Sequence, residues 1–523
     1  MDSPVVKTSK GAVRGTVDEA VEVFKGVPYA GTTAGANRFR PPVPREAWDG
    51  ELDATAYGAS SPQGTGSAAA MPEELLSILG VLADAHEQGE DCLVLNVWTP
   101  RSGDGGARPV MVWLHGGGYT SGSGSSRVFR GARLAARGDV VVITLNHRLG
   151  PFGFLELAEV GGDAYADSGN VGILDIVAAL QWVQQEIAAF GGDPGNVTIF
   201  GESGGGGKVS TLLGMPIARG LFHRAVVQSG PGLRSTELTD ATATSRAVLE
   251  ALGLDETRVD ELQTVPAADL LAAAGKVTGG GIGFAGGSSR GFGPVLDGRS
   301  ITAHPFDPVA PSGAADIPLL IGTNKDEAAL FVVMMPGFDD MDDAAHENLL
   351  RAIAGERADA LLAAYATTRP GSTPAERTVA AMTARFWAGS ILQAERKAAA
   401  STAPTFMYLL TYETDVYGGR LKSPHALEIP FVFDMVDDSA FTGSWDGRQR
   451  LADAMSDAWI AFARSGDPNH PGLPTWPPYS AHDRSTMIFD RDCRVDVDPM
   501  AEERLAWEGA AVGTLAEPAV LGV

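Results

Sequence analysis

FGGDPGNVTIFGESGGGG, residues 190–207, is the stretch of sequence that decides the fold. Its apolar run VTIF (197–200) predicts a buried strand. A Gly-x-Ser-x-Gly pattern follows at once, in the order Gly201, Glu202, Ser203, Gly204, Gly205. Glycines two places before and two places after the serine permit a sharp strand-to-helix turn that lifts the serine hydroxyl above the sheet edge. The stretch therefore predicts a strand, a strained turn and a helix, with Ser203 as a candidate nucleophile.

Short apolar runs alternate with helical patterns on both sides of this stretch. Continuous Val, Ile and Leu runs are what a sheet covered by helices on both faces requires, because neither face meets water. The predicted strands are 93–98, 110–114, 140–145, 197–200, 225–229, 318–323 and 406–410. Helical patterns lie at 173–190, 240–275, 344–400 and 447–465. The sequence therefore predicts an α/β fold with a large, mostly parallel central sheet.

Three segments lie outside this alternation. Residues 5–31 alternate apolar and polar side chains around turn glycines and predict a small antiparallel β-structure. Residues 64–89, with an amphipathic helical pattern, and the glycine-rich loop 275–293 are expected to be insertions around the active site. A length of 523 residues would allow three domains. Because the strands from 93 to 410 are expected to share one sheet, we expect a single domain over 1–523.

The composition of the chain limits which partners and which cellular compartment are expected. The chain has 65 acidic and 40 basic side chains and a formal charge of -25, so a nucleic acid would meet net repulsion. It contains no run of 18 apolar residues and no apolar stretch near Met1, so neither a membrane span nor a signal peptide is predicted. Two cysteines, Cys92 and Cys493, cannot form a disulfide framework. We expect a cytoplasmic protein.

A second glycine-rich segment could stabilise negative charge next to a nucleophile. HGGG, residues 115–118, follows the predicted strand 110–114. Its backbone N–H groups, together with that of Gly204, could bind the oxyanion of a tetrahedral intermediate. A phosphate-binding loop is the alternative, but no Lys-Ser or Lys-Thr follows and the spacing is not that of a dinucleotide fingerprint.

A nucleophilic serine needs a base and an orienting acid, which follow it in chain order in sheets of this design. The strand 318–323 leads into a polar turn with two candidate acids, Asp326 and Glu327, between which position does not decide. The histidines that follow are the candidate bases: His346, His425, His470 and His482. His425 is preferred because it lies in a loop after the strand 406–410, just before an apolar segment.

Further motifs run along nearly the whole chain. They include EDCLVLNVWTP (90–100), NHRLGPFGFL (146–155), GTNKDEAALF (322–331) and HALEIPFVF (425–433). Together with the two glycine motifs they resemble the type-B carboxylesterase and cholinesterase family of α/β-hydrolases, in particular its bacterial, p-nitrobenzyl-esterase-like members. The resemblance implies the α/β-hydrolase fold.

The resemblance also implies roles for individual residues. Ser203, Glu327 and His425 would form the catalytic triad. Gly117, Gly118 and Gly204 would supply the oxyanion-binding N–H groups. Glu202 and Ser229 match positions that support the active site. Two structural ion pairs are implied as well: Arg38 with Glu90, and Arg148 with Asp175.

One departure from the family bears on the compartment. Cys92 matches a cysteine that secreted members pair with a cysteine in an upstream CPQ motif, where this chain has SPQ at 61–63. That disulfide is therefore absent, which agrees with a reducing environment.

The expected activity is hydrolysis of small carboxylic esters through an acyl-enzyme intermediate. Hydrolysis of carbamates or aryl amides by the same serine is the alternative, and a non-catalytic adhesion protein is a remote one, because some family members have lost the serine. No cofactor or metal is expected, since the histidines show no ligand spacing. A monomer or a weak dimer is expected.

Overall fold

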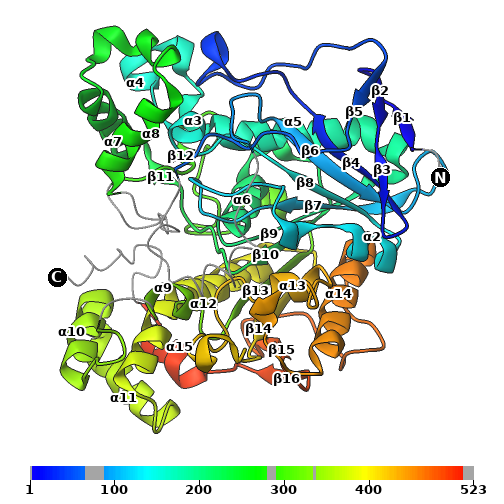
Figure 1. Ribbon diagram of the computed structural model, residues 1–523. Coiled ribbons are helices and arrows are strands. Elements are labelled where there is room, and N and C mark those ends of the chain that lie inside the picture. The colour runs from blue at the N-terminus through cyan, green and yellow to red at the C-terminus, as the bar shows by residue number, and fades with distance from the viewer. Residues whose placement is uncertain (1–2, 65–86, 280–289, 334–336, 510–523) are drawn as a thin grey trace.

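The computed structural model describes residues 3–64, 87–279, 290–333 and 337–509. A large mixed sheet runs through their centre with helices on both sides (Figure 1). Its strand order is β16-β15-β14-β13-β10-β9-β7-β8-β6-β4-β3. The bounds are β3 Thr16–Asp18, β4 Val21–Pro28, β6 Val94–Thr99, β7 Arg108–Leu114, β8 Val141–Leu145, β9 Gly192–Glu202, β10 Arg224–Gln228, β13 Leu319–Asn324, β14 Thr405–Leu410, β15 Ser485–Phe489 and β16 Arg494–Val497.

The direction of the strands changes only towards the edges of the sheet. Neighbouring strands from β15 to β8 pair in parallel. The strands β6, β4 and β3 at one edge and β16 at the other pair antiparallel. The mostly parallel sheet predicted from the sequence is confirmed, and all seven predicted strands belong to it.

Helices follow the strands and cover the sheet. Their bounds are α2 Ala132–Gly138, α3 Gly150–Phe154, α4 Ala158–Gly161, α5 Val171–Glu186, α6 Gly204–Gly214, α7 Leu238–Ala251, α8 Ala267–Thr278, α9 Ala329–Val332, α10 Asp343–Ala354, α11 Ala358–Thr368, α12 Pro374–Ala400, α13 Ile429–Val432, α14 Arg448–Ser465 and α15 Ala501–Trp507.

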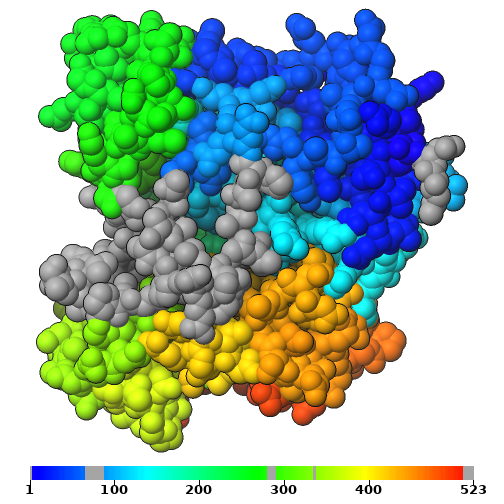
Figure 2. Space-filling view, viewed as in Figure 1, coloured from blue at the N-terminus to red at the C-terminus, as the bar shows by residue number. Residues whose placement is uncertain are grey.

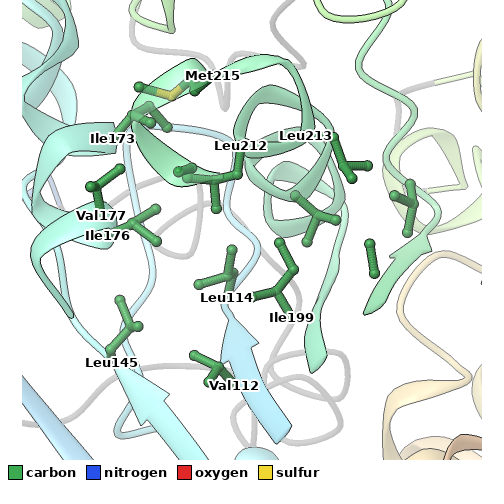
Figure 3. Close-up of a cluster of buried hydrophobic side chains, with 14 of the residues drawn as sticks. Val112, Leu114, Leu145, Ile173, Ile176, Val177, Ile199, Leu212, Leu213 and Met215 are labelled. Atoms are coloured by element: carbon green, nitrogen blue, oxygen red, sulfur yellow. The ribbon is translucent and has the colours of Figure 1, made fainter. Parts of the chain in front are cut away.

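Alternating side chains of each central strand enter two separate cores. On β7, Val112 and Leu114 pack with residues of α5 and α6, as Figure 3 shows. Met111 and Trp113 point to the other face and pack with residues of α2, α13 and α14. Each such buried side chain contributes about 1.5–3 kcal/mol of burial free energy. The apolar strands therefore hold the sheet between two layers of helices.

The second layer joins distant parts of the chain. Arg137 of α2 forms ion pairs with Asp453 and Asp457 of α14. In Figure 2 the cyan segment that contains α2 correspondingly borders the orange segment that contains α14.

Several boundaries differ from the sequence prediction. The antiparallel structure expected over 5–31 is divided: β1 Val5–Lys7 and β2 Ala12–Arg14 form a small sheet with β5 Glu51–Asp53, whereas β3 and β4 join the main sheet. The strand β15 and the edge strand β16 were not predicted, because their sequences STMIF and RVDV lack the continuous Val, Ile and Leu runs of the central strands. The helix α8 extends to Thr278, into the expected loop 275–293. Residues 65–86 and 280–289 of the two expected insertions lie outside the described residues.

Candidate active site

Ser203 lies at the turn between β9 and α6. Its backbone angles, φ 56° and ψ -123°, are strained for a residue with a side chain. Hydrogen bonds hold the turn on both sides: the Ser203 N–H donates to Gln228 O (2.8 Å), and the Gly207 N–H donates to Ser203 O (3.1 Å). The strand, strained turn and helix predicted from residues 190–207 are therefore present.

The turn is packed so closely that neighbouring positions have no room for a side chain. A Cβ atom at Gly205 would lie 2.0 Å from Leu114 O, and one at Gly230 would lie 1.8 Å from Ser203 O. Both contacts are with backbone, which cannot move aside as a flexible side chain can. These glycines allow three strand ends to meet at Ser203.

The glycine loop 115–118 lies directly beside the serine. A Cβ atom at Gly116 would lie 3.4 Å from Ser203 Cβ, and one at Gly204 would lie 2.2 Å from Gly118 O. Within the described residues, the backbone N–H groups of Gly117, Gly118 and Gly204 donate to no acceptor. Backbone donors without partners next to a serine are available to a ligand oxygen.

Glu327 and His425, the candidate acid and base, contact each other. Glu327 follows β13, and His425 lies between β14 and α13. His425 Nδ1 is 2.5 Å from Glu327 Oε2, while Glu327 Oε1 accepts from the Asn324 N–H at 2.7 Å. Glu327 is 0% exposed and His425 is 4% exposed. The carboxylate is therefore fixed at both oxygens, and it holds the imidazole by one nitrogen.

The second imidazole nitrogen faces the residue that precedes the serine. His425 Nε2 lies 3.0 Å from Glu202 Oε1. Burial by itself lowers the pKa of His425, but the charges of Glu202 and Glu327 outweigh burial and raise the pKa to about 10. Burial raises the pKa of Glu202, against the lowering effect of His425. The histidine thus connects the acid to the serine turn.

Asp326 and the other candidate histidines contact other parts of the protein. Asp326 Oδ2 accepts from the Ser423 N–H at 3.4 Å. His346 contacts Thr378, His470 contacts the carbonyl of Ala454, and His482 contacts Asp483. Of the two candidate acids, the one in contact with His425 is Glu327.

Ser229 directly follows the neighbouring strand β10. Its φ is 50°, and its N–H donates to Gly322 O at 2.8 Å. Its hydroxyl has no hydrogen-bond partner among the described residues. Ser229 is adjacent in sequence to Gly230, which packs on the carbonyl of Ser203.

A further carboxyl group lies behind the histidine and was not predicted. Asn324 Nδ2 donates to Glu428 Oε2 at 2.6 Å, and Gln228 Nε2 donates to Glu428 Oε1 at 3.3 Å. Burial and the nearby charges of Glu202 and Glu327 raise the pKa of Glu428 to about 8. A polar residue three places after His425 within an apolar segment was the signal that sequence reasoning passed over.

Lys208 was also missed. It is buried in α6, five residues after Ser203, and contacts the glycine loop. A lysine within an otherwise uncharged helix that follows a candidate nucleophile could have been noticed.

The ion pairs implied by the family resemblance are present. Arg38 Nε lies 2.8 Å from Glu90 Oε2, and Arg148 Nη2 lies 2.6 Å from Asp175 Oδ1. The Arg148 pair is fully buried. Both pairs tie loops near the ends of strands to the body of the protein.

The described residues contain no group of three or more His, Cys, Asp or Glu side chains arranged to hold a metal ion. None of their helices is long and apolar enough to cross a membrane.

Comparisons with known proteins identify the family of the chain. The model of the carboxylesterase family matches residues 2–507. The chain is 39% identical to the para-nitrobenzyl esterase of Bacillus subtilis over 96% of this chain and 98% of that protein. It is 34% identical to the phenmedipham hydrolase of Pseudarthrobacter oxydans, over 93% and 94%. A crystal structure of a Geobacillus stearothermophilus carboxylesterase superposes with a TM-score of 0.83 at 38% identity, over 96% of this chain and all of that one. The chain therefore belongs to the carboxylesterase family, has the α/β-hydrolase fold and is a carboxylic-ester hydrolase.

Proposed function

We propose that the protein hydrolyses small carboxylic esters through an acyl-enzyme formed on Ser203, with His425 as the general base and Glu327 as the orienting acid. The observation that carries the proposal is the chain of contacts from Glu327 through His425 to Glu202, which adjoins Ser203. A catalytic triad requires an acid in contact with the base and a base near the serine. The Glu327–His425 contact supplies the first link, and the contact of His425 with Glu202 brings the imidazole to the residue next to Ser203.

In the first half of the reaction, Ser203 Oγ bonds to the ester carbonyl carbon and its proton passes to His425 Nε2. The carbonyl oxygen becomes an oxyanion, which accepts hydrogen bonds from the N–H groups of Gly117, Gly118 and Gly204. The carbon–oxygen bond to the alcohol then breaks, and the alcohol leaves with the proton from His425.

Water completes the cycle by the same steps. It attacks the acyl carbonyl while His425 takes its proton, and the acid leaves as that proton returns to Ser203 Oγ. Throughout, Glu327 accepts the Nδ1–H of His425, so that Nε2 is the nitrogen that exchanges protons. Glu202 and Ser229 support the turn, Glu202 by its contact with the imidazole.

A fluorophosphonate probe tests the nucleophile. We expect stoichiometric labelling of the protein on Ser203 and none of the Ser203→Ala variant. Equal labelling of both would contradict the assignment.

Matched substrates test the reaction class. p-Nitrobenzyl and p-nitrophenyl esters are the first choice, because a relative 39% identical is named a para-nitrobenzyl esterase. A p-nitrophenyl series from acetate to palmitate would define the acyl preference. Turnover of a phenylcarbamate faster than of the matched ester would contradict ester hydrolysis as the main activity.

We propose a cytoplasmic location and a monomer or weak dimer built as one domain over 1–523. The location is supported by Cys92 and Cys493, which are both free thiols, Cys92 being buried beside Ser61. The single domain is supported by a sheet whose strands extend from Thr16 to Val497. Cell fractionation and light scattering of the purified protein would test the compartment and the oligomeric state.

A further inference from the structure

Lys208 is a buried cation that the proposed reaction leaves without a role. Its side chain is 0% exposed. Nζ donates to His115 O and to Gly118 O, both at 2.9 Å, and lies 5.5 Å from the centre of the Tyr119 ring. A buried ammonium group is costly unless its N–H groups are bonded. The two carbonyl groups therefore stabilise Lys208 in this position.

These two carbonyl groups are the first and the last of the glycine loop 115–118. The second carbonyl lies 2.8 Å from His115 Nδ1, and the third accepts from the Ser121 N–H at 3.1 Å. Every carbonyl group of the loop is thus bonded on the protein side. C=O and N–H point in opposite directions across a trans peptide, so the contacts of the Gly116 and Gly117 carbonyls orient the N–H groups of Gly117 and Gly118. Lys208 bonds the carbonyls of the two flanking peptide units and so holds the loop at both ends.

The loop needs such fixing. Gly117 and Gly118 have φ angles of 81° and 60°, and glycine moves more freely between conformations than any other residue. Oxyanion-binding N–H groups are effective only when they are held in place before the reaction. Of the contacts that hold the loop carbonyls, the two from Lys208 tie the loop to α6, the helix that begins directly after Ser203.

We propose that Lys208 is a positioning residue, which holds the loop 115–118 against α6 so that its N–H groups face the reacting carbonyl. The proposal rests on the oxyanion role given to Gly117 and Gly118 above. It assigns to Lys208 an effect on the transition state and none on the binding of the ground-state ester.

The contact does not depend on one protonation state. Burial lowers the pKa of Lys208 to about 7, against the raising effect of Glu202. An ammonium group has three N–H donors and the neutral amine has two, so either form can bond both carbonyls. The imidazoles of His115 and His147, which stack 4.9 Å apart beside this lysine, have pKa values lowered by burial.

The test compares Lys208→Met, which keeps the length of the side chain and removes its donors, with Lys208→Gln, which keeps two N–H donors without charge. Lys397→Met is the matched control, because Lys397 is 1% exposed and bonds Ser401 at the end of α12. For each variant, kcat and KM on a p-nitrophenyl ester are normalised to sites titrated with a fluorophosphonate. The affinity for a trifluoromethyl ketone, which forms an oxyanion on the serine, is measured alongside.

For Lys208→Met we expect kcat and trifluoromethyl ketone affinity to fall together by at least about tenfold, with KM changed less than about twofold. Lys208→Gln should lie between this variant and the parent, and Lys397→Met should match the parent. Unchanged ketone affinity in Lys208→Met, or a loss confined to KM, would overturn the proposal.

A variant that does not fold and a parent protein that is inactive lead to different conclusions. If Lys208→Met does not fold, the same comparison in Lys208→Gln decides: a loss of ketone affinity that Lys397→Met does not share supports the proposal, whereas parent-like affinity, or a loss matched by Lys397→Met, overturns it. If the parent protein itself neither hydrolyses esters nor labels on Ser203, the proposed function fails first. That result can be distinguished from an active parent whose oxyanion binding does not depend on Lys208.

Discussion

Backbone packing holds one side of the active site, and buried side chains hold the other. The glycine side includes Gly117, Gly204–Gly206 and Gly230, where backbone packs on backbone at distances that exclude a Cβ atom. The carboxylate side consists of the buried side chains of Glu327, His425 and Glu428. Glu327 contacts His425, and Asn324 donates to both carboxylates. Ser203 lies where the two sides meet.

Because of this difference, substitutions on the two sides should affect stability and activity differently. On the glycine side the constraint is space, so an added methyl group displaces backbone and destabilises the fold. On the carboxylate side the constraint is charge and proton position, so an isosteric amide leaves the shape intact and changes the chemistry. Stability and activity should therefore separate between the two sides.

Ser203→Ala, at the junction, should have the largest effect. We expect kcat to fall by about 10⁶-fold, because the nucleophile is removed while the binding groups remain. Ester turnover corrected for contaminating esterase is the measurement. A variant that retained a substantial fraction of the parent rate would place the nucleophile elsewhere.

Glu327→Gln tests the carboxylate side. We expect kcat to fall by about 10⁴-fold, because the amide favours the wrong tautomer of His425. The midpoint of thermal unfolding should change little, since the Asn324 N–H still has an acceptor. A large loss of stability with retained activity would contradict the view that the carboxylate side determines the chemistry and not the stability.

Gly230→Ala tests the glycine side. Its Cβ would lie 1.8 Å from Ser203 O, so we expect a loss of about 3 kcal/mol or more in the free energy of unfolding, together with lost activity. Urea unfolding measures the first and ester turnover the second.

Gly275→Ala is its control. Gly275 lies in α8, where a Cβ would meet nothing within 4 Å. This change should raise stability by up to about 1 kcal/mol, because alanine favours helix over glycine, and should leave turnover unchanged. Equal destabilisation by Gly230→Ala and Gly275→Ala would contradict the claim that the backbone packing around Ser203 excludes a side chain.

Glu202→Gln should change the pH dependence. The charge of Glu202 helps to raise the pKa of His425, and only the neutral imidazole can act as a base. Removing that charge lowers the pKa, so activity should appear at lower pH as the imidazole loses its proton earlier. We expect the acidic limb of kcat/KM to move down by on the order of one pH unit.

Asp326→Asn is the matched control for this shift. Asp326 is a buried carboxyl group that contacts the Ser423 N–H. The pH dependence of kcat/KM for Asp326→Asn should coincide with that of the parent protein. An acidic limb of Glu202→Gln at the parent's pH or above would show that Glu202 does not govern the imidazole.

The central strands of the sheet and the serine turn could be predicted from the sequence. The apolar strands 110–114 and 197–200 and the glycines around Ser203 are local signals, because strand burial and turn geometry depend on neighbouring residues. By contrast, the short strand β15 depends on pairing with the distant strand β14, and β16 pairs in turn with β15. The sequences of both carry little local pattern.

Only the tertiary structure decided which side chains meet. Asp326 and Glu327 are equivalent by sequence position, and family resemblance alone favoured Glu327; the path of the chain then brings Glu327 to His425 across 98 residues. It likewise brings Lys208 to the carbonyls of the glycine loop, about 90 residues earlier. Such contacts arise from how strands and helices pack, which depends on the whole chain and not on the residues around either partner.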